Sequence, residues 1–331
     1  MKQLIKIEES KLARQKLNVE LYKKVYLIRR AEEKIREYYA EDEMKTPMHM
    51  SMGEEAIAAG VCHALNNCDQ VFTTYRSHAV FLAKTQNCDE FFAEMYAKET
   101  SSIKGKGGSM HLCLPADGFM GTSAIVGAHI PVAVGCAFAN KIKNNNKIVA
   151  VFFGDGAVDE GVFWESINVA CLMRLSVLFL CEDNNLAVHT FSYERRGYSS
   201  ITQIISRFNC QVFESDSTDT EEIYNLTLKA LMQIRRENKP CFMNLKYYRY
   251  LEHVGVNYDF DVGYRSKEEF ENWYKRDPVS LLRKKLLDCG LGIEEIKKIE
   301  EDINSKIDQS ILKAKKAPFS EQSELHKDIF K

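Results

Sequence analysis

The chain has 331 residues, of which 45% are hydrophobic and 28% are charged, with a formal net charge of −2. These values are typical of a globular chain with a large core, and they give no reason to expect nucleic acid or an anionic membrane as a partner. No apolar run is long enough for a transmembrane helix, and the first residues are too polar for a secretory signal. The ten cysteines form no Cys-x-x-Cys motif, so we expect reduced thiols in a cytoplasmic protein.

The spacing of apolar and small residues predicts a helical N-terminal region with one short strand. Within 10–45, apolar residues fall on one stripe of a helix and charged residues cover the rest. Further helices are expected at 53–65 and 88–98, and a strand at 71–75. Residues 101–123 are rich in Gly, Ser and Lys, which predicts a long loop of the kind that is usually functional.

Two apolar runs in the middle of the chain predict neighbouring strands of a parallel sheet. Ile148–Phe153 and Leu175–Cys181 are almost continuously apolar, as strands buried on both faces are, and a helical pattern at about 162–173 lies between them. Asp155 follows the first run and Asn184 follows the second. Ligands of parallel sheets bind beyond the carboxyl ends of the strands, so we expect these oxygen donors to lie together. Mg²⁺ prefers such ligands, together with phosphate oxygens and water.

The residues after Asp155 fit a bound phosphate. Gly156 and Ala157 would bring the backbone close to the anion, and the helix that follows would present its free N–H groups to it. The alternative is a strand-to-helix turn, in which Gly-Asp-Gly is only turn chemistry and Asn184 caps a helix. Gly-Asp-Gly alone favours that alternative, whereas the paired strand ends favour a site.

Four further segments complete the secondary structure before the tail. The small residues of 126–139 predict a helix deep in the core, and 220–237 predicts another helix. A strand at 241–248 is expected to close the sheet. Residues 251–266 lack periodicity, so they are expected to form a second long loop.

The predicted architecture is one large α/β domain at 46–290, with a parallel sheet and helices on both faces. A helical extension at 1–45 precedes it, and an amphipathic helix and tail at 291–331 follow it. Isoleucines three or four residues apart from Ile296 to Ile311 define that helix, which is expected to end before Pro318. The helix could bind a partner, or it could equally pack on its own domain.

The stretch from Gly154-Asp155-Gly156 to Asn184 resembles the thiamine diphosphate motif. Other motifs agree with one family in that group, the alpha subunit of 2-oxo acid dehydrogenase E1 components of the pyruvate and acetoin dehydrogenase type. These motifs are Tyr75-Arg76-Ser77-His78, Gly105–His111, Ile125–Ala128 and Tyr248-Arg249-Tyr250. The resemblance covers about residues 20 to 290 and implies the diphosphate-binding half of the thiamine diphosphate-binding fold.

The resemblance implies cofactor contacts in two further segments. Tyr75 and Arg76 match residues that contact the diphosphate, and the planar, charged fork of arginine suits a phosphate. Without the family, a surface ion pair would be the simpler interpretation. Ala124 and Val126 match positions whose backbone groups bind the aminopyrimidine ring, although Ala124 stands where relatives often carry Gly. The alternative for that segment is a plain loop that leads into a helix.

A backbone carbonyl completes the implied metal site. Leu186 stands where relatives often carry Tyr, and the resemblance implies that its carbonyl joins Asp155 and Asn184 as a ligand of Mg²⁺. A backbone ligand makes no demand on the side chain. Two phosphate oxygens and one water would complete a six-coordinate shell.

Histidines are the candidate catalytic residues. His253 matches a loop histidine that relatives place over the cofactor, and a near-neutral pKa would suit it to proton transfer; a solvated loop histidine is the alternative. His49 matches a substrate-pocket histidine, and the methionines around it could line a pocket or fill the core. His78 and His111 are weaker candidates. Val254 replaces a regulatory serine of the mitochondrial enzymes, so phosphorylation at that position is excluded.

The resemblance also implies partners and a reaction. The expected enzyme binds thiamine diphosphate and Mg²⁺ and decarboxylates a 2-oxo acid such as pyruvate. The glutamate that activates the cofactor belongs to a separate beta subunit in this family, so the chain is expected to be active only as an α₂β₂ heterotetramer. A lipoyl E2 protein is the usual acceptor; a carboligase subunit of a specialised biosynthetic pathway and a non-catalytic scaffold are alternatives. Gly105–Ser109 lacks P-loop spacing, and no Rossmann fingerprint occurs.

Overall fold

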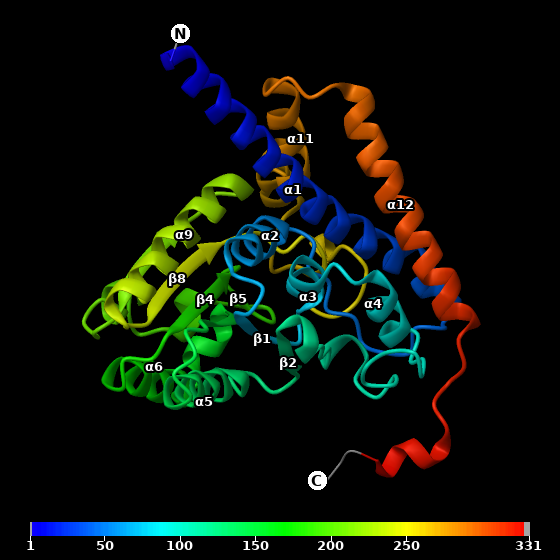
Figure 1. The fold of residues 1–331 in the computed structure, drawn as a ribbon. Coiled ribbons are helices and arrows are strands. Elements are labelled where there is room, and N and C mark those ends of the chain that lie inside the picture. The colour runs from blue at the N-terminus through cyan, green and yellow to red at the C-terminus, as the bar shows by residue number, and fades with distance from the viewer. Residues whose placement is uncertain (1, 328–331) are drawn as a thin grey trace.

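The computed structural model of the protein describes residues 2–327. At its centre is a six-stranded sheet in which all neighbouring strands are parallel, in the spatial order β2-β1-β3-β4-β8-β7 (Figure 1). The strands are β1 (Gln70–Thr74), β2 (Phe119–Ser123), β3 (Val149–Gly154), β4 (Val177–Asp183), β7 (Gln211–Ser215) and β8 (Cys241–Lys246). This sheet confirms the predicted α/β class.

The helices make up most of the remaining described chain. They are α1 (Lys2–Tyr38), α2 (Glu55–Ala64), α3 (His78–Thr85), α4 (Cys88–Met95), α5 (His129–Ile142), α6 (Gly161–Leu172), α7 (Ser192–Arg195), α8 (Ile201–Ile205), α9 (Thr220–Glu237), α10 (Lys267–Tyr274), α11 (Pro278–Asp288) and α12 (Ile293–Lys316). A two-stranded hairpin, β5 (Leu186–Ala187) with β6 (Thr190–Phe191), stands beside the sheet. Within residues 2–327, no helix combines the length and apolar character needed to cross a bilayer.

Helices cover both faces of the sheet because successive residues of each strand point to opposite sides. Val149, Val151 and Phe153 of β3 belong to a buried cluster with residues of α5 and α6. Ala150 and Phe152 of the same strand belong to the second cluster, with residues of α1, α2, α3 and α9. Figure 1 shows α5 and α6 below the sheet and α1, α2 and α3 above it. The sheet is therefore buried on both sides, as its apolar strands require.

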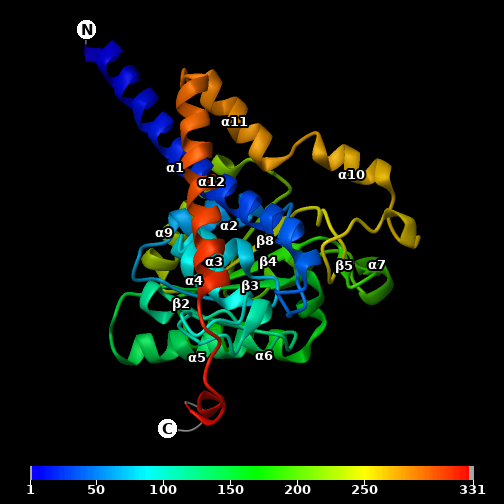
Figure 2. The same cartoon turned by 90° about the vertical axis from the view of Figure 1, so that its right-hand side faces the viewer.

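The first and last long helices, α1 and α12, pack together on the upper face. In Figures 1 and 2, α12 lies against α1, and α11 lies beside their N-terminal parts. Ile296, Ile307 and Ile311 of α12 are buried there, and the helix ends at Lys316, two residues before the predicted proline stop. The amphipathic face of this helix is therefore covered by its own chain, which is the second of the two uses that the sequence left open.

Three local predictions were wrong. The segment predicted as the loop 101–123 contains β2, a short edge strand whose glycine and hydroxyl residues hide the strand pattern. The strand predicted to close the sheet, β8, is covered by a further edge strand, β7. The small-residue helix predicted deep in the core begins at His129 and has an exposed apolar face, where Val132 is 50% and Ile142 70% exposed.

Candidate functional site

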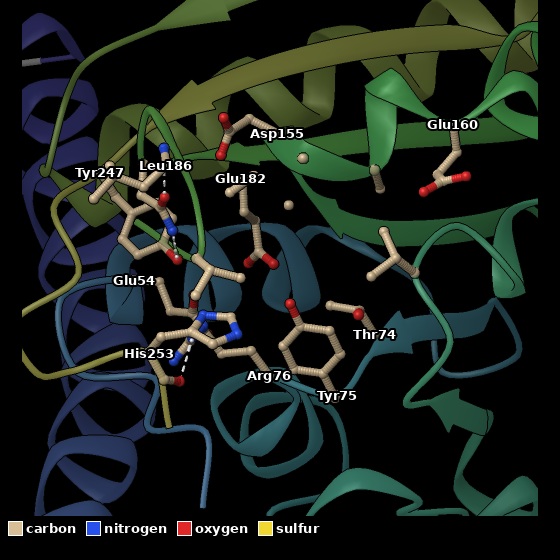
Figure 3. Close-up of a pocket in the computed structure, with 17 residues that line it drawn as sticks. Glu54, Thr74, Tyr75, Arg76, Asp155, Glu160, Glu182, Leu186, Tyr247 and His253 are labelled. Carbon is tan, nitrogen blue, oxygen red and sulfur yellow. Dashed lines mark hydrogen bonds between the residues drawn. The ribbon is translucent and has the colours of Figure 1, made fainter. Parts of the chain in front are cut away.

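A cavity of about 220 Å³ lies beyond the carboxyl ends of β1, β3 and β4 (Figure 3). From β1 the chain leads to β2 on one side and afterwards to β3 and β4 on the other, so the cavity lies where the strand order reverses. Ligands of open parallel sheets bind at this point. The lining residues are Glu54, Thr74, Tyr75, Arg76, Val126, Gly154, Asp155, Gly156, Ala157, Glu160, Glu182, Asn184, Leu186, Ala187, Val188, Tyr247 and His253.

Asp155 is buried, with 1% of its surface exposed, directly after β3. Its Oδ2 accepts a hydrogen bond from Nη2 of Arg195 at 2.6 Å, and its backbone oxygen accepts one from Arg196 at 2.7 Å. Its Oδ1 has no hydrogen-bond partner. Burial raises the pKa of Asp155 to about 7, and Asp183 adds to the rise, whereas the two arginines oppose it. The carboxyl group thus keeps one oxygen for a ligand.

Asn184 and Leu186 reach the same cavity from the segment after β4. Gly154 pairs with Glu182 in the register of β3 and β4, so the residues that follow the two strands leave the sheet at one edge. The amide nitrogen of Asn184 donates to the hydroxyl of Tyr247 at 2.9 Å, and its oxygen accepts from the backbone N–H of Leu186 at 3.0 Å. The amide oxygen of Asn184 and the unpartnered Oδ1 of Asp155 are oxygen ligands of the kind that a hard divalent cation prefers.

Arg76 is held rigidly on the opposite wall of the cavity. Its Nη1 donates to the backbone oxygen of Met50 at 2.6 Å, and its Nη2 donates to the backbone oxygen of His253 at 3.0 Å. Arg76 is only 6% exposed, and in the described part of the chain its hydrogen bonds go to backbone oxygens and to the His253 ring rather than to a carboxylate. In Figure 3, Tyr75 and Arg76 lie side by side on this wall and the Tyr75 hydroxyl points into the cavity. A buried, unneutralised cation favours an anionic ligand.

His253 is a neutral hydrogen-bonding group. Its Nδ1 lies 3.4 Å from Nη2 of Arg76 and 3.3 Å from Nη1 of Arg249, so this nitrogen must accept and the ring proton belongs on Nε2. Burial lowers the pKa of His253 to about 3, with further lowering by Arg76 and Arg249. The near-neutral pKa expected from the sequence is therefore wrong, because burial and two cations disfavour the imidazolium.

His49 lies behind the cavity wall rather than on it. The centroid of its ring lies 4.5 Å from that of Tyr75 and 5.4 Å from that of His253, and its Nδ1 has no hydrogen-bond partner. Burial lowers the pKa of His49 to about 3, and Arg76 lowers it further. The methionines beside it, Met48, Met50 and Met52, are buried core residues that do not line the cavity.

The two weaker histidine candidates lie elsewhere. His78 is fully buried, with Nδ1 2.7 Å from Oε1 of Glu32 and Nε2 2.7 Å from Oγ of Ser109. These two contacts link α1, through His78 of α3, to the loop before β2. His111 is exposed and lies 3.2 Å from the backbone oxygen of Gly107. Neither histidine lines the cavity.

The remaining predicted residues divide between the cavity and its rim. Gly156 and Ala157 line the cavity within the 3₁₀ turn that separates β3 from α6. A Cβ at Gly156 would lie 3.0 Å from that of Ala187, so glycine here also lets the β5–β6 hairpin pack closely. Val126 lines the cavity and is 40% exposed, whereas Ala124 follows β2 and does not line it.

Sequence reasoning missed two carboxyl groups on this cavity. Glu54 is fully buried before α2, and neither of its carboxyl oxygens has a partner. Glu182, at the end of β4, is 2% exposed and has an unpartnered Oε1. Burial raises the pKa of Glu182, and Glu54 raises it further. A glutamate directly after the apolar run of β4 was a visible signal, but Glu54 gave none.

The glycine-rich segment does not form a phosphate cradle. Its backbone N–H groups point to Glu94, which is 1% exposed. One oxygen of Glu94 accepts from Gly107 and Gly108, both at 2.7 Å, and the other accepts from Gly105 at 2.9 Å. Ser101 also donates to this carboxylate. Because these amides are already used, the segment is a structural loop.

Comparisons with known proteins agree with this geometry. Residues 23–323 match the family model described as "Dehydrogenase E1 component". The chain is 32% identical to the pyruvate dehydrogenase E1 component subunit alpha of Rickettsia felis, over 94% of this chain and 95% of the relative. It is 31% identical to the proteins of the same name from Zymomonas mobilis, over 94% and 88%, and Porphyra purpurea, over 96% and 94%. The family resemblance predicted from the motifs is confirmed.

Proposed function

Because this chain belongs to the dehydrogenase E1 component family, as an alpha subunit of the thiamine diphosphate-dependent 2-oxo acid dehydrogenases, we propose that its cavity binds the cofactor diphosphate through Mg²⁺. One observation supports this most directly. The buried Asp155 keeps an unpartnered Oδ1 on a cavity that Asn184 and Leu186 also line. Mg²⁺ would be held by these three residues and by phosphate oxygens.

The other residues of the cavity would bind the anion. Arg76 supplies a fixed cation, and Tyr75 supplies a hydroxyl donor on the same wall. The Nε2–H group of His253 is a further donor, and we assign this residue, and His49 behind the cavity wall, the catalytic roles that the resemblance of their segments implies. When bound, thiamine diphosphate supplies the nucleophilic carbon and the electron sink for decarboxylation. The residues of this chain bind and orient it.

Metal binding would rearrange the present contacts of Asp155. Arg195 forms an ion pair with this carboxylate, and Arg195 and Arg196 also form ion pairs with Asp159. Asp159 can retain both arginines when a cation occupies the cavity. Asp155 therefore has a cationic partner both before and after metal binding, which lowers the cost of its burial.

A beta subunit would complete the enzyme, and we propose an α₂β₂ heterotetramer. An alpha subunit by name implies such a partner, and the lower face of this chain has a surface for one. Four apolar side chains of this face are 50–78% exposed: Val132 and Ile142 of α5, Leu172 of α6, and Ile125 in the loop before α5. Phe138 of α5 is 39% exposed. Exposed apolar groups of this kind, on helices that pack side by side, mark an interaction surface. Val126 joins this surface to the cavity, so a partner here could reach the cofactor.

The remaining expectations complete the proposal. The substrate is a small 2-oxo acid of the pyruvate type, and the acceptor is a lipoyl E2 protein. The protein acts in the cytoplasm. The division into 1–45, 46–290 and 291–331 describes a helical extension, the cofactor domain and the C-terminal helix with its tail.

Reconstitution tests this function. The purified chain with Mg²⁺, thiamine diphosphate and pyruvate is expected to release no CO₂, and adding the beta subunit is expected to start the release. Calorimetric titration of the reconstituted pair with thiamine diphosphate should show binding that EDTA abolishes. Turnover by the chain alone would contradict the division of the site between subunits, and cofactor binding unaffected by EDTA would contradict the metal site.

A further inference from the structure

Glu54 is buried on the cavity wall without any hydrogen-bond partner. Its exposed fraction is 0%, and both Oε1 and Oε2 lack partners. Among the side chains that the structure describes, in residues 11–327, no other carboxyl group has both oxygens buried and unpartnered. The next residue provides a contrast, because Glu55 is equally buried but forms an ion pair with Arg29 at 2.7 Å.

Within residues 11–327, no cation forms a direct contact with the carboxyl oxygens of Glu54. Arg76 influences it electrostatically, but both of its Nη groups are bound to backbone oxygens and it forms no ion pair with Glu54. The other ionisable groups that face Glu54 are Glu182 at the end of β4, Glu32 of α1 and the Tyr247 hydroxyl after β8. In Figure 3, Glu54 lies beside His253, and the Glu182 carboxyl points toward Tyr75 and Arg76.

An isolated carboxylate in such a place is unfavourable, and the group takes up a proton instead. Burial raises the pKa of Glu54 to about 8; Arg76 and the nearby side chains of Ser51 and Tyr247 oppose the rise, and Glu32 adds to it. A protonated carboxyl group has an O–H that must donate, and among the described residues no group accepts it with normal hydrogen-bond geometry, although the side chains of Ser51 and Tyr247 lie nearby. The cavity is therefore the place where its acceptor binds.

We propose that Glu54 is a neutral carboxylic acid at neutral pH and that it donates a hydrogen bond to the anionic ligand of this cavity. This inference rests on the proposed function, because that ligand would be the diphosphate end of the cofactor. A neutral donor attracts a phosphate oxygen, whereas an ionised Glu54 would repel it. Glu54 is thus a binding residue whose protonation sets the pH range of cofactor affinity.

The first test needs no cofactor. A folded-state pKa above the unfolded value means that the folded chain binds the extra proton, so this stability is present at low pH and is lost as pH rises through about 8. Glu54→Gln removes the titration and keeps the shape. The midpoint of urea unfolding of the wild type should fall relative to that of E54Q between pH 6 and 9. Glu301→Gln, the same change at an exposed position of α12, should run parallel to the wild type.

The second test measures the ligand. If only the neutral form binds, the affinity of the reconstituted wild-type pair for Mg²⁺ and thiamine diphosphate falls about tenfold between pH 7 and 9. The E54Q pair should change less than about twofold, because its amide remains a donor. Calorimetry of the wild type at pH 8.5 in buffers of different ionisation enthalpy should also show proton uptake on binding. That measurement requires no variant, so a folding failure of E54Q would not block the test.

The outcomes separate the two proposals. If neither pair binds thiamine diphosphate, the proposed function fails and the donation with it, while urea unfolding still decides whether Glu54 is protonated. If both pairs bind with the same pH dependence and the wild type takes up no proton, Glu54 does not act on the ligand. A constant difference between wild type and E54Q in urea from pH 6 to 9 would overturn the neutral state itself.

Discussion

The cavity and the glycine-rich loop are built from similar residues, but they differ in how their polar groups are satisfied. In the loop, three glycine amides donate to Glu94, and Ser109 lies within hydrogen-bond distance of His78. In the cavity, Asp155 and Glu54 keep buried oxygens without partners. The polar groups of the loop form hydrogen bonds that stabilise the fold, whereas those of the cavity remain available to a ligand.

This difference teaches that a motif alone does not locate an anion site. A glycine-rich segment before a serine suggests phosphate binding, but here the N–H groups turn inward to a carboxylate. The Gly-Asp-Gly segment has a similar composition, yet it lies at the reversal point of the sheet with an unpartnered oxygen. The two segments therefore differ in whether their polar groups already have hydrogen-bond partners within the chain.

Asp155→Asn should have the largest effect on the cavity side. Because a ligand carboxylate is lost, the Mg²⁺-dependent affinity of the reconstituted pair for thiamine diphosphate should fall at least about 100-fold in calorimetry. Asp159→Asn is the matched control, since Asp159 pairs with the same arginines but does not line the cavity. Its affinity should stay within about threefold of the wild type, and an equal loss in both variants would show that the arginines, not the metal, govern the site.

Glu94→Gln should have the largest effect on the loop side. The amide offers one acceptor where the carboxylate offers two, and its NH₂ group would face the donors of the loop. The free energy of unfolding, measured in urea, should fall by about 2–3 kcal/mol. Glu90→Gln, at a glutamate that accepts one backbone N–H from the same loop, should cost less than about 1 kcal/mol. A weaker cofactor affinity with unchanged stability would instead make this loop part of the site.

Val132→Asp tests a third kind of unpartnered group, the apolar face of α5. A charge at this 50% exposed position should weaken assembly with the beta subunit at least about tenfold in sedimentation or calorimetric titration. The stability of the isolated chain should change by less than about 1 kcal/mol. Met232→Asp on α9, where the methionine is 68% exposed, is the control and should leave assembly unchanged. Comparable assembly by both variants would remove α5 from the interface.

Gly156→Ala should have the smallest effect. The new Cβ would lie 3.0 Å from that of Ala187, so the β5–β6 hairpin must shift slightly at a cost of about 1 kcal/mol in the free energy of unfolding. Gly154→Ala is the control, because a Cβ there meets no atom within 4 Å, and it should change stability by less than about 0.5 kcal/mol. Equal stabilities would mean that glycine at 156 serves only the ligand.

The sequence predicted the central unit of the fold well, because that unit obeys local rules. The apolar runs of β3 and β4 and the period of α6 follow from burial on both faces of a parallel sheet. The edge strands β2 and β7 were missed because edge strands carry little apolar signal. The depth of α5 was misjudged because small residues suit a tight core and a subunit interface equally well.

The site was predictable where its residues follow strands, and unpredictable where they arrive from elsewhere. Asp155, Asn184 and Arg76 each follow a strand, so topology alone brings them to one edge of the sheet. Glu54 precedes α2, and Arg195 lies after the β5–β6 hairpin. No local pattern predicts that Glu54 lines the cavity or that Arg195 contacts Asp155. Their contacts depend on long-range packing, which only the folded structure reveals.

A crystal structure of the reconstituted pair with thiamine diphosphate and Mn²⁺ in place of Mg²⁺ tests the central claim most directly. An anomalous peak should lie within metal–oxygen bonding distance, about 2.0–2.3 Å, of Asp155, Asn184 and the carbonyl of Leu186, with Arg195 displaced from Asp155. A peak elsewhere, or cofactor bound while Arg195 still occupies Asp155 and no metal touches it, would contradict the account.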